Sequence, residues 1–143
     1  MDLSFSRQEK KILKLTEKTI KKWRSILYID PLWNIYIDVF DDEEMPLALA
    51  RVDASSTEYY MATIELSYSM LQMVEEEFME KIDDIICHEL LHLVMIDFFR
   101  TAQVAAGESE EMHKELKYKY EQFTSRLQRA FMDMYKKVKG ATE

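Results

Sequence analysis

The chain begins with apolar positions spaced as on one face of a helix. The residues that recur at steps of three and four are Ile12, Thr16, Ile20, Trp23 and Leu27. Asp30 precedes Pro31, and the residue before a proline is pushed out of helical conformation. We therefore predict a helix from residue 5 to about residue 28.

The pattern then changes to the two-residue alternation of a strand. Over residues 33–40, apolar β-branched and aromatic residues alternate with Asn34 and Asp38. Two further short apolar runs follow, at residues 47–52 and 59–66. The short connections between the three runs predict a small, three-stranded, mostly antiparallel sheet.

Helical spacing returns from about residue 70 and continues to about residue 99. The apolar positions of this segment are Phe78, Ile82, Ile85, Ile86, Leu90, Leu93 and Val94. Gly107 marks a break, and Ser109 is a suitable cap for a last helix over about 109–138. We expect its buried stripe to be Leu116, Tyr120, Phe123, Leu127, Phe131 and Met134. The whole pattern predicts an α+β fold in one domain, residues 1–143.

Composition narrows the class of protein. With 143 residues and 48% hydrophobic content, the chain is long enough for one domain with a true core. A net charge of −8 argues against a nucleic-acid partner, which needs clustered Lys and Arg. Cys87 is the single cysteine, no run of 18 apolar residues exists, and the lysine-rich start does not resemble a signal peptide. We expect a cytoplasmic protein without a transmembrane segment. Its oligomeric state is left open.

The sequence His88-Glu89-Leu90-Leu91-His92 carries the candidate chemistry. Positions i and i+4 of a helix lie nearly above one another, so His88 and His92 present two imidazoles that one Zn²⁺ can bridge. Glu89 is then placed to act as general base on a zinc-activated water. The surrounding residues are strongly apolar, and polar groups buried there need a partner. The pattern predicts a zinc site with Glu89 as the catalytic residue.

A catalytic zinc site needs a third protein ligand and one open position. The residues available after the motif are His113, Glu108, Glu110, Glu111 and Glu115. Cys87 lies about 100° around the helix from His88, and we interpret it as a small buried side chain. Tyr118, Tyr120 and His113 are candidates for stabilising an oxyanion, and spacing does not choose among them.

The motif and its spacing resemble those of the gluzincin metallopeptidases, in which the third ligand is a glutamate on a later helix. In many of them eighteen residues separate that glutamate from the second histidine. Counting residues 93 to 110 after His92 leads to Glu111. The resemblance implies Glu111 as third zinc ligand, with His113 as runner-up, and Glu115 as the acid that orients a zinc-bound histidine.

The order of the expected elements is similar to that of the smallest zincins: minimal gluzincins, SprT-like domains and phage-encoded HExxH proteins. These share an N-terminal helix, a short sheet, the motif helix and a long C-terminal helix. SprT-like proteins use a third histidine in another local context, which favours the glutamate type here. The resemblance also implies that the strand before the motif helix, residues 59–66, is a sheet edge that pairs with an extended substrate.

The expected function is therefore zinc-dependent hydrolysis of peptide bonds, with a peptide or protein substrate. The alternative is a non-catalytic, zinc-stabilised protein-interaction domain, because a chain of this size leaves little room for a deep cleft. A zinc hydrolase for non-peptide amides is a third possibility, since the same chemistry serves any polarised carbonyl.

Overall fold

The computed structural model describes residues 5–29, 31–41, 49–56 and 60–142. The chain divides into two compact units, an N-terminal unit Met1–Leu90 and a C-terminal unit Leu91–Glu143. The boundary falls inside one helix rather than in a linker. The prediction of a single domain therefore stays a prediction.

The N-terminal unit opens with helix α1 (Arg7–Ile26). The Ser6 hydroxyl accepts a hydrogen bond from the Glu9 backbone N–H (3.2 Å), which caps the helix. The predicted apolar face is confirmed, because Ile12, Thr16, Ile20, Trp23 and Leu27 are all buried.

Three strands follow: β1 (Asn34–Phe40), β2 (Ala50–Ser56) and β3 (Met61–Ser67). Their order in the sheet is β1-β3-β2. β3 is antiparallel to β2 and parallel to β1, so the sheet is mixed, and the prediction of a mostly antiparallel sheet is wrong on this point. The expected edge strand is also wrong, because β3 is the central strand and both of its sides are paired. Residues 47, 48 and 59 of the predicted strands lie outside the described residues.

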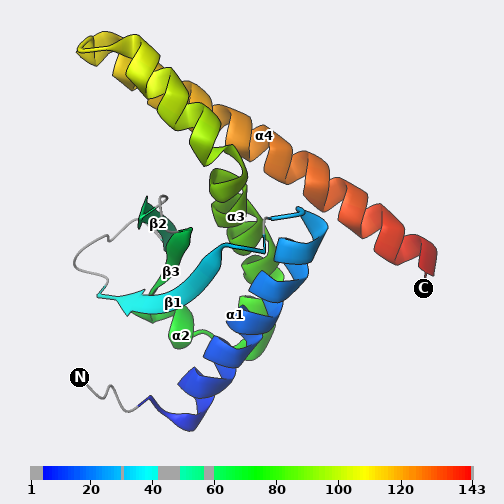
Figure 1. Ribbon diagram of the computed structural model, residues 1–143. Helices are drawn as coiled ribbons and strands as arrows, with labels where there is room; N and C mark the ends of the chain where they lie inside the picture. Colours follow the sequence, from blue (N-terminus) through cyan, green and yellow to red (C-terminus); the bar gives the residue numbers. More distant parts are fainter. Residues whose placement is uncertain (1–4, 30, 42–48, 57–59, 143) are drawn as a thin grey trace. The chain divides into compact units, whose positions relative to one another are not determined.

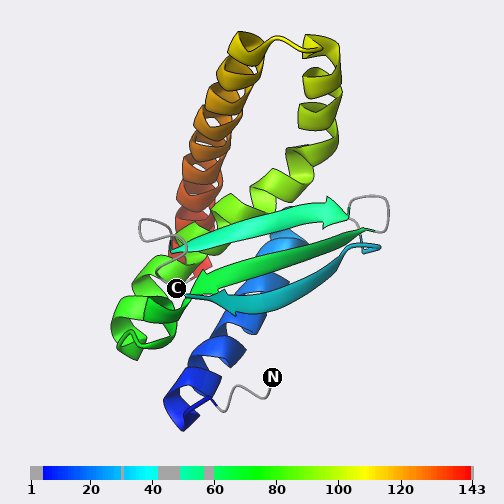
Figure 2. The same ribbon diagram turned by 90° about the vertical axis from the view of Figure 1, so that its left-hand side faces the viewer.

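One face of the sheet carries the core. Alternate β3 residues Ala62, Ile64 and Leu66 are buried, and their partners across both strand pairs belong to the same face. Helix α1 and the first part of helix α3 (Glu75–Ala106) cover this face, and no helix among the described residues of the N-terminal unit covers the other one (Figures 1 and 2). A short helix, α2 (Tyr68–Leu71), connects β3 to α3.

Trp23 joins α1 to α3 inside this core. Its side chain is fully buried, and its indole N–H donates to the Asp83 carboxylate (2.7 Å). The same carboxylate is 2.5 Å from the Lys22 ammonium. Buried Phe78, Ile82 and Ile86 form the apolar face of this part of α3.

The C-terminal unit is a helical hairpin. The last part of α3 runs to Ala106, seven residues beyond the expected end, and α4 (Glu110–Thr142) returns beside it (Figures 1 and 2). Gly107 has φ +64°, a conformation that glycine adopts without steric cost. The Met112 N–H donates to the Ser109 hydroxyl (3.3 Å), which confirms Ser109 as the cap.

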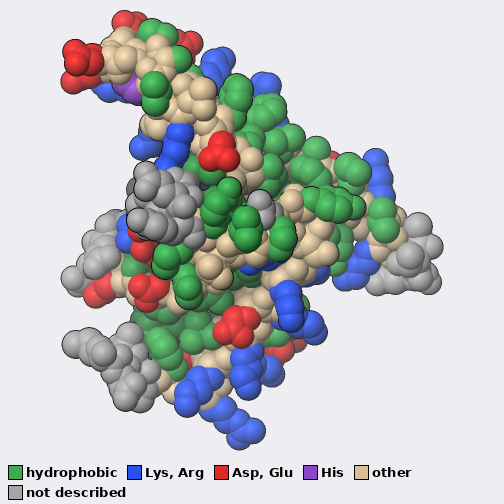
Figure 3. Space-filling model, in the orientation of Figure 1, with side chains coloured by type: hydrophobic (Ala, Val, Ile, Leu, Met, Phe, Trp, Pro, Cys, Tyr) green, Lys and Arg blue, Asp and Glu red, His purple; other side chains and the backbone are tan. Residues whose placement is uncertain are grey.

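Four residues of the predicted buried stripe of α4 are half-buried, namely Leu116, Tyr120, Leu127 and Phe131, and the prediction is wrong at the other two. Phe123 is 53% exposed and Met134 is 62% exposed, whereas Thr124 and Met132 are buried. In the space-filling view, hydrophobic side chains gather in a band along α4 (Figure 3). The chain therefore leaves part of this apolar surface in contact with solvent.

Candidate metal centre

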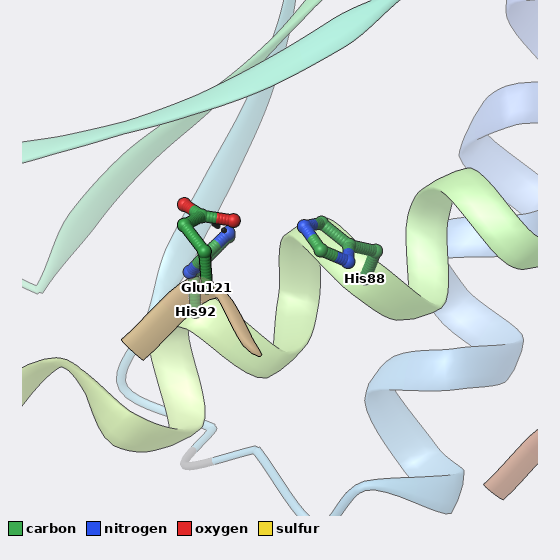
Figure 4. Close-up of side chains that lie close together, drawn as sticks. All are labelled: His88, His92 and Glu121. Atoms are coloured by element: carbon green, nitrogen blue, oxygen red, sulfur yellow. Dashed lines mark ion pairs between the residues drawn. The ribbon is translucent and has the colours of Figure 1, made fainter. Parts of the chain in front are cut away.

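The motif lies in the interior of α3, where the helix fixes its geometry. Three glutamates occupy the first turn of α3, where carboxylates favour the positive end of the helix dipole. His88 follows about three turns later, and His92 follows His88 by one turn (Figure 4). Both imidazoles therefore project from one side of α3, as the spacing predicts.

His92 is the more buried of the two histidines, at 8% exposure. Its Nδ1 atom is buried, and its Nε2 atom lies 3.5 Å from Oε1 of Glu121 on α4 (Figure 4). Nε2 is thus the nitrogen available to a ligand at this place. The side chain of Glu121 is half-exposed, so the pair opens toward solvent on the Glu121 side.

Tyr120 holds the backbone of His92 in place. Its hydroxyl donates to the His92 carbonyl (2.9 Å), and its ring lies 4.8 Å from the imidazole. The Tyr120 ring also stacks on the ring of Phe99, with the two ring centroids 4.1 Å apart. Tyr120 ties α4 to α3 beside the candidate ligands, because one side chain contacts both the ring and the backbone of His92.

The distance between His92 and Glu121 suits metal ligands. A hydrogen bond from nitrogen to oxygen is usually about 2.7–3.2 Å long, shorter than the 3.5 Å observed. Two ligand atoms on a tetrahedral Zn²⁺, each about 2.1 Å from the ion, lie about 3.4 Å apart. The pair is therefore spaced as two ligands of one ion would be.

Glu121 was not among the residues selected from the sequence. The hairpin offers a signal for it: α3 ends at Ala106 and α4 begins at Glu110, so the turn is centred near residue 108. His92 lies 16 residues before this centre, and the residue 16 positions after it is residue 124. In a hairpin of two antiparallel helices, His92 therefore lies beside about residue 124. Glu121 is the carboxylate residue within one helical turn of residue 124. Finding it in this way requires knowing where α3 ends and where α4 begins.

The residues selected by resemblance lie nearer the hairpin turn. Glu111 is exposed in the first turn of α4, ten residues before Glu121, or about 15 Å along the helix axis. Glu115 is also exposed, about 9 Å from Glu121 along the axis. The carboxylate that the structure brings to His92 is that of Glu121. The roles assigned to Glu111 and Glu115 stay predictions.

His113 has a local partner. Its Nε2 atom is 2.7 Å from the Gly107 carbonyl, so that nitrogen carries the proton and donates it. This hydrogen bond links the first turn of α4 to the turn of the hairpin. A histidine engaged in this way stabilises the connection between the helices.

Two neighbours of His88 differ in their surroundings. Glu89 is half-buried on α3 and keeps access to solvent. Cys87 is fully buried; burial first, and then the Asp84 and Asp83 carboxylates, raise the pKa of its thiol to about 12. Cys87 is therefore a small side chain packed in the interior beside α3 residues of the core.

Comparison of the chain with models of known protein families, with curated proteins and with solved structures gives no match. Within the part of the chain that the structure describes, no helix is both long and apolar enough to cross a membrane.

Proposed function

We propose that His88, His92 and Glu121 bind one zinc ion, and that the protein is a zinc-dependent peptidase with Glu89 as general base. The observation that carries the proposal is the His92–Glu121 pair, one helical turn after His88. Each of the three residues offers one ligand atom. The proposal keeps the chemistry expected from the motif and replaces Glu111 with Glu121 as the third ligand.

The set of donors fits a catalytic zinc ion. Two imidazole nitrogens and one carboxylate oxygen are a ligand set that zinc hydrolases use, with a fourth position for water or substrate. The half-exposure of Glu121 leaves solvent access for that fourth position. The apolar neighbours of the motif, Leu90, Leu91 and Leu93, are buried, so the two histidines lie on a well-packed segment of α3.

Glu89 is the residue proposed to move the proton. When bound, zinc lowers the pKa of a coordinated water to about 7 and polarises a carbonyl. Glu89 follows His88 directly on α3, and its half-buried carboxylate would accept the proton of the attacking water and pass it to the leaving amine. The substrate class is an accessible peptide bond in an unfolded or extended segment.

A second function has an observation of its own. His92 lies on α3 and Glu121 on α4, so an ion bound by both would cross-link the two helices of the C-terminal unit. Such an ion stabilises the fold whether or not a substrate reaches it. A zinc-stabilised interaction domain is therefore the second candidate.

The variant Glu89→Gln separates the two functions. We expect it to keep the zinc content of the wild type and to cleave a labelled unstructured protein about 10²–10⁴-fold more slowly. Glu80→Gln is the matched control, because Glu80 is an exposed glutamate of the same helix. Cleavage by Glu89→Gln at the wild-type rate would overturn the role of Glu89. If zinc-loaded wild type cleaves no substrate, the peptidase proposal is wrong and the zinc-stabilised interaction domain is the better proposal.

A further inference from the structure

The C-terminal unit contains an apolar groove between the last part of α3 and α4. Its volume is about 720 Å³. Val94, Phe98 and Ala102 line it from α3, and Leu116, Tyr120 and Phe123 line it from α4. Both sets are spaced at three or four residues, so each helix contributes one continuous stripe.

The stripes are exposed to a degree that packed helices avoid. Phe98 is 81% exposed, Phe123 is 53% exposed and Val94 is 51% exposed. Single exposed apolar residues are ordinary, but a contiguous apolar patch on a protein surface usually marks a binding site. The exposed rings and the exposed valine all line the same groove, so they form one apolar patch.

The charges of the groove have one sign. Its charged lining residues are Lys119 and Arg126, with no carboxylate, although the chain has a net charge of −8. Both cations are exposed on α4. Neither forms an ion pair with a residue of the described ranges. The groove is therefore an apolar channel with a basic rim on an acidic protein.

The size of the groove matches a short helix. The lining residues on α3 span positions 94–102, about 12 Å of helix, and those on α4 span positions 116–126, about 15 Å. Two neighbouring helices present a groove that a third helix fills with residues at i, i+3, i+4 and i+7. Three turns of helix would cover the groove along its length.

We propose that this groove binds an amphipathic helix of a partner protein, with one apolar stripe and acidic residues on its flanks. The apolar stripe covers Phe98 and Phe123, and the flanking carboxylates pair with Lys119 and Arg126. The proposal does not depend on zinc, because no candidate metal ligand lines this groove.

Charge decides against a second copy of this chain as the occupant. Placing two grooves face to face would bring two copies of Lys119 and two of Arg126 onto one seam, and the linings supply no carboxylate to offset them. Like charges at the centre of an interface oppose its formation. An acidic partner helix meets the same cations with attraction.

The test uses a fluorescein-labelled helical peptide of about fourteen residues, with Leu at i, i+3, i+4 and i+7 and Glu on both flanks. A matched peptide carries Lys in place of every Glu. We expect fluorescence anisotropy to show binding of the acidic peptide at least about tenfold tighter than that of the basic peptide. Equal or reversed affinities would overturn the proposal.

Two variants locate the binding. Phe98→Ser should weaken binding of the acidic peptide about tenfold. Val138→Ser should leave it unchanged, since Val138 is also apolar and exposed but lies on α4 outside the groove. The double variant Lys119→Glu with Arg126→Glu should reverse the preference between the peptides. Circular dichroism confirms that each variant is folded.

Other occupants give distinct results. If the wild type sediments as a dimer that Phe98→Ser dissociates, and neither peptide binds, the groove is an interface between copies and the proposal is wrong. If vesicles of anionic lipid bind and the acidic peptide does not, the proposal is likewise wrong.

Discussion

The two units of the chain treat their hydrophobic residues in opposite ways. In the N-terminal unit, Trp23, Phe78 and Ile64 are fully buried in a core between one sheet face and two helices. In the C-terminal unit, Phe98 and Val104 are more than 80% exposed on a hairpin of two helices. The first unit therefore carries a conventional core, whereas the second presents apolar surface.

The core that stabilises the fold lies in one unit, whereas the proposed binding surface lies in the other. Regions with few buried apolar residues open at low free energy, and binding and switching sites are drawn from such regions. The C-terminal unit holds the His92–Glu121 pair and the basic-rimmed groove, and we expect it to be the less stable unit until ligands bind. The following predictions test this contrast.

The largest effect is expected from truncating the core of the N-terminal unit. Trp23→Ala removes a fully buried ring and leaves the Asp83 carboxylate without its indole donor. We expect a loss of about 3–5 kcal/mol in the free energy of unfolding, measured by urea titration. Phe98→Ala, which truncates the exposed ring of the other unit, should change it by less than about 0.5 kcal/mol. Equal losses would contradict the contrast between the units.

Zinc should stabilise the parts of α3 and α4 that carry its proposed ligands. At about 100 times its dissociation constant, a ligand that binds only the folded state adds about 2.7 kcal/mol. We expect zinc to slow amide hydrogen exchange around His92 and Glu121 and to leave the sheet unchanged. The same experiment on His92→Ala should show no zinc effect. Slowing of exchange by zinc in that variant would place the ion elsewhere.

The N-terminal caps of α1 and α4 allow the same substitution to be compared in the two units. Ser6 and Ser109 each accept a hydrogen bond from a backbone N–H three residues later. Replacing either with Ala should lower helix stability by about 1 kcal/mol. Because the N-terminal unit has the larger core, Ser6→Ala should lower the midpoint of cooperative unfolding, while Ser109→Ala should chiefly speed local hydrogen exchange in α4. The reverse pattern would contradict the expected order of stability.

The smallest effect on stability near neutral pH concerns Cys87. Its pKa is raised from the ordinary value of 9.0 to about 12, so the folded protein holds the thiol proton more tightly than the unfolded chain does. Its contribution to stability is complete below pH 9 and is lost as pH rises toward about 12. At pH 8 we expect slow reaction with a disulfide reagent in the folded protein and fast reaction in denaturant. Fast reaction of the folded protein would show that Cys87 is accessible.

Local features were predictable from the sequence because they depend on neighbouring residues. The buried face of α1 follows from helical spacing, and Ser109 follows from the preference of helix starts for a hydroxyl. β1 and β3 were found for the same reason, since two-residue alternation is local, whereas β2 continues to Ser56 through polar residues beyond the predicted end at residue 52. His88 and His92 are one turn apart on α3 whatever the remainder of the chain does.

Features that depend on distant segments were not predictable in this way. The insertion of β3 between β1 and β2 is set by pairing across the chain, and it turned an expected edge strand into the central one. Phe123 and Met134 have the spacing of core residues, but spacing alone does not tell whether another segment packs on them. In the described residues both side chains are exposed. Glu121 depends on the register of the hairpin, which follows only once α3 is known to continue to Ala106.

The most direct test of the account is the zinc content of two glutamine variants. Native mass spectrometry of purified, zinc-equilibrated protein would compare Glu121→Gln with Glu111→Gln, the carboxylates chosen by the structure and by family spacing. We predict about one zinc ion per chain in the wild type and in Glu111→Gln, and little in Glu121→Gln. Zinc retained by Glu121→Gln and lost from Glu111→Gln would contradict the assignment of the third ligand, and wild type without zinc would contradict the metal centre itself.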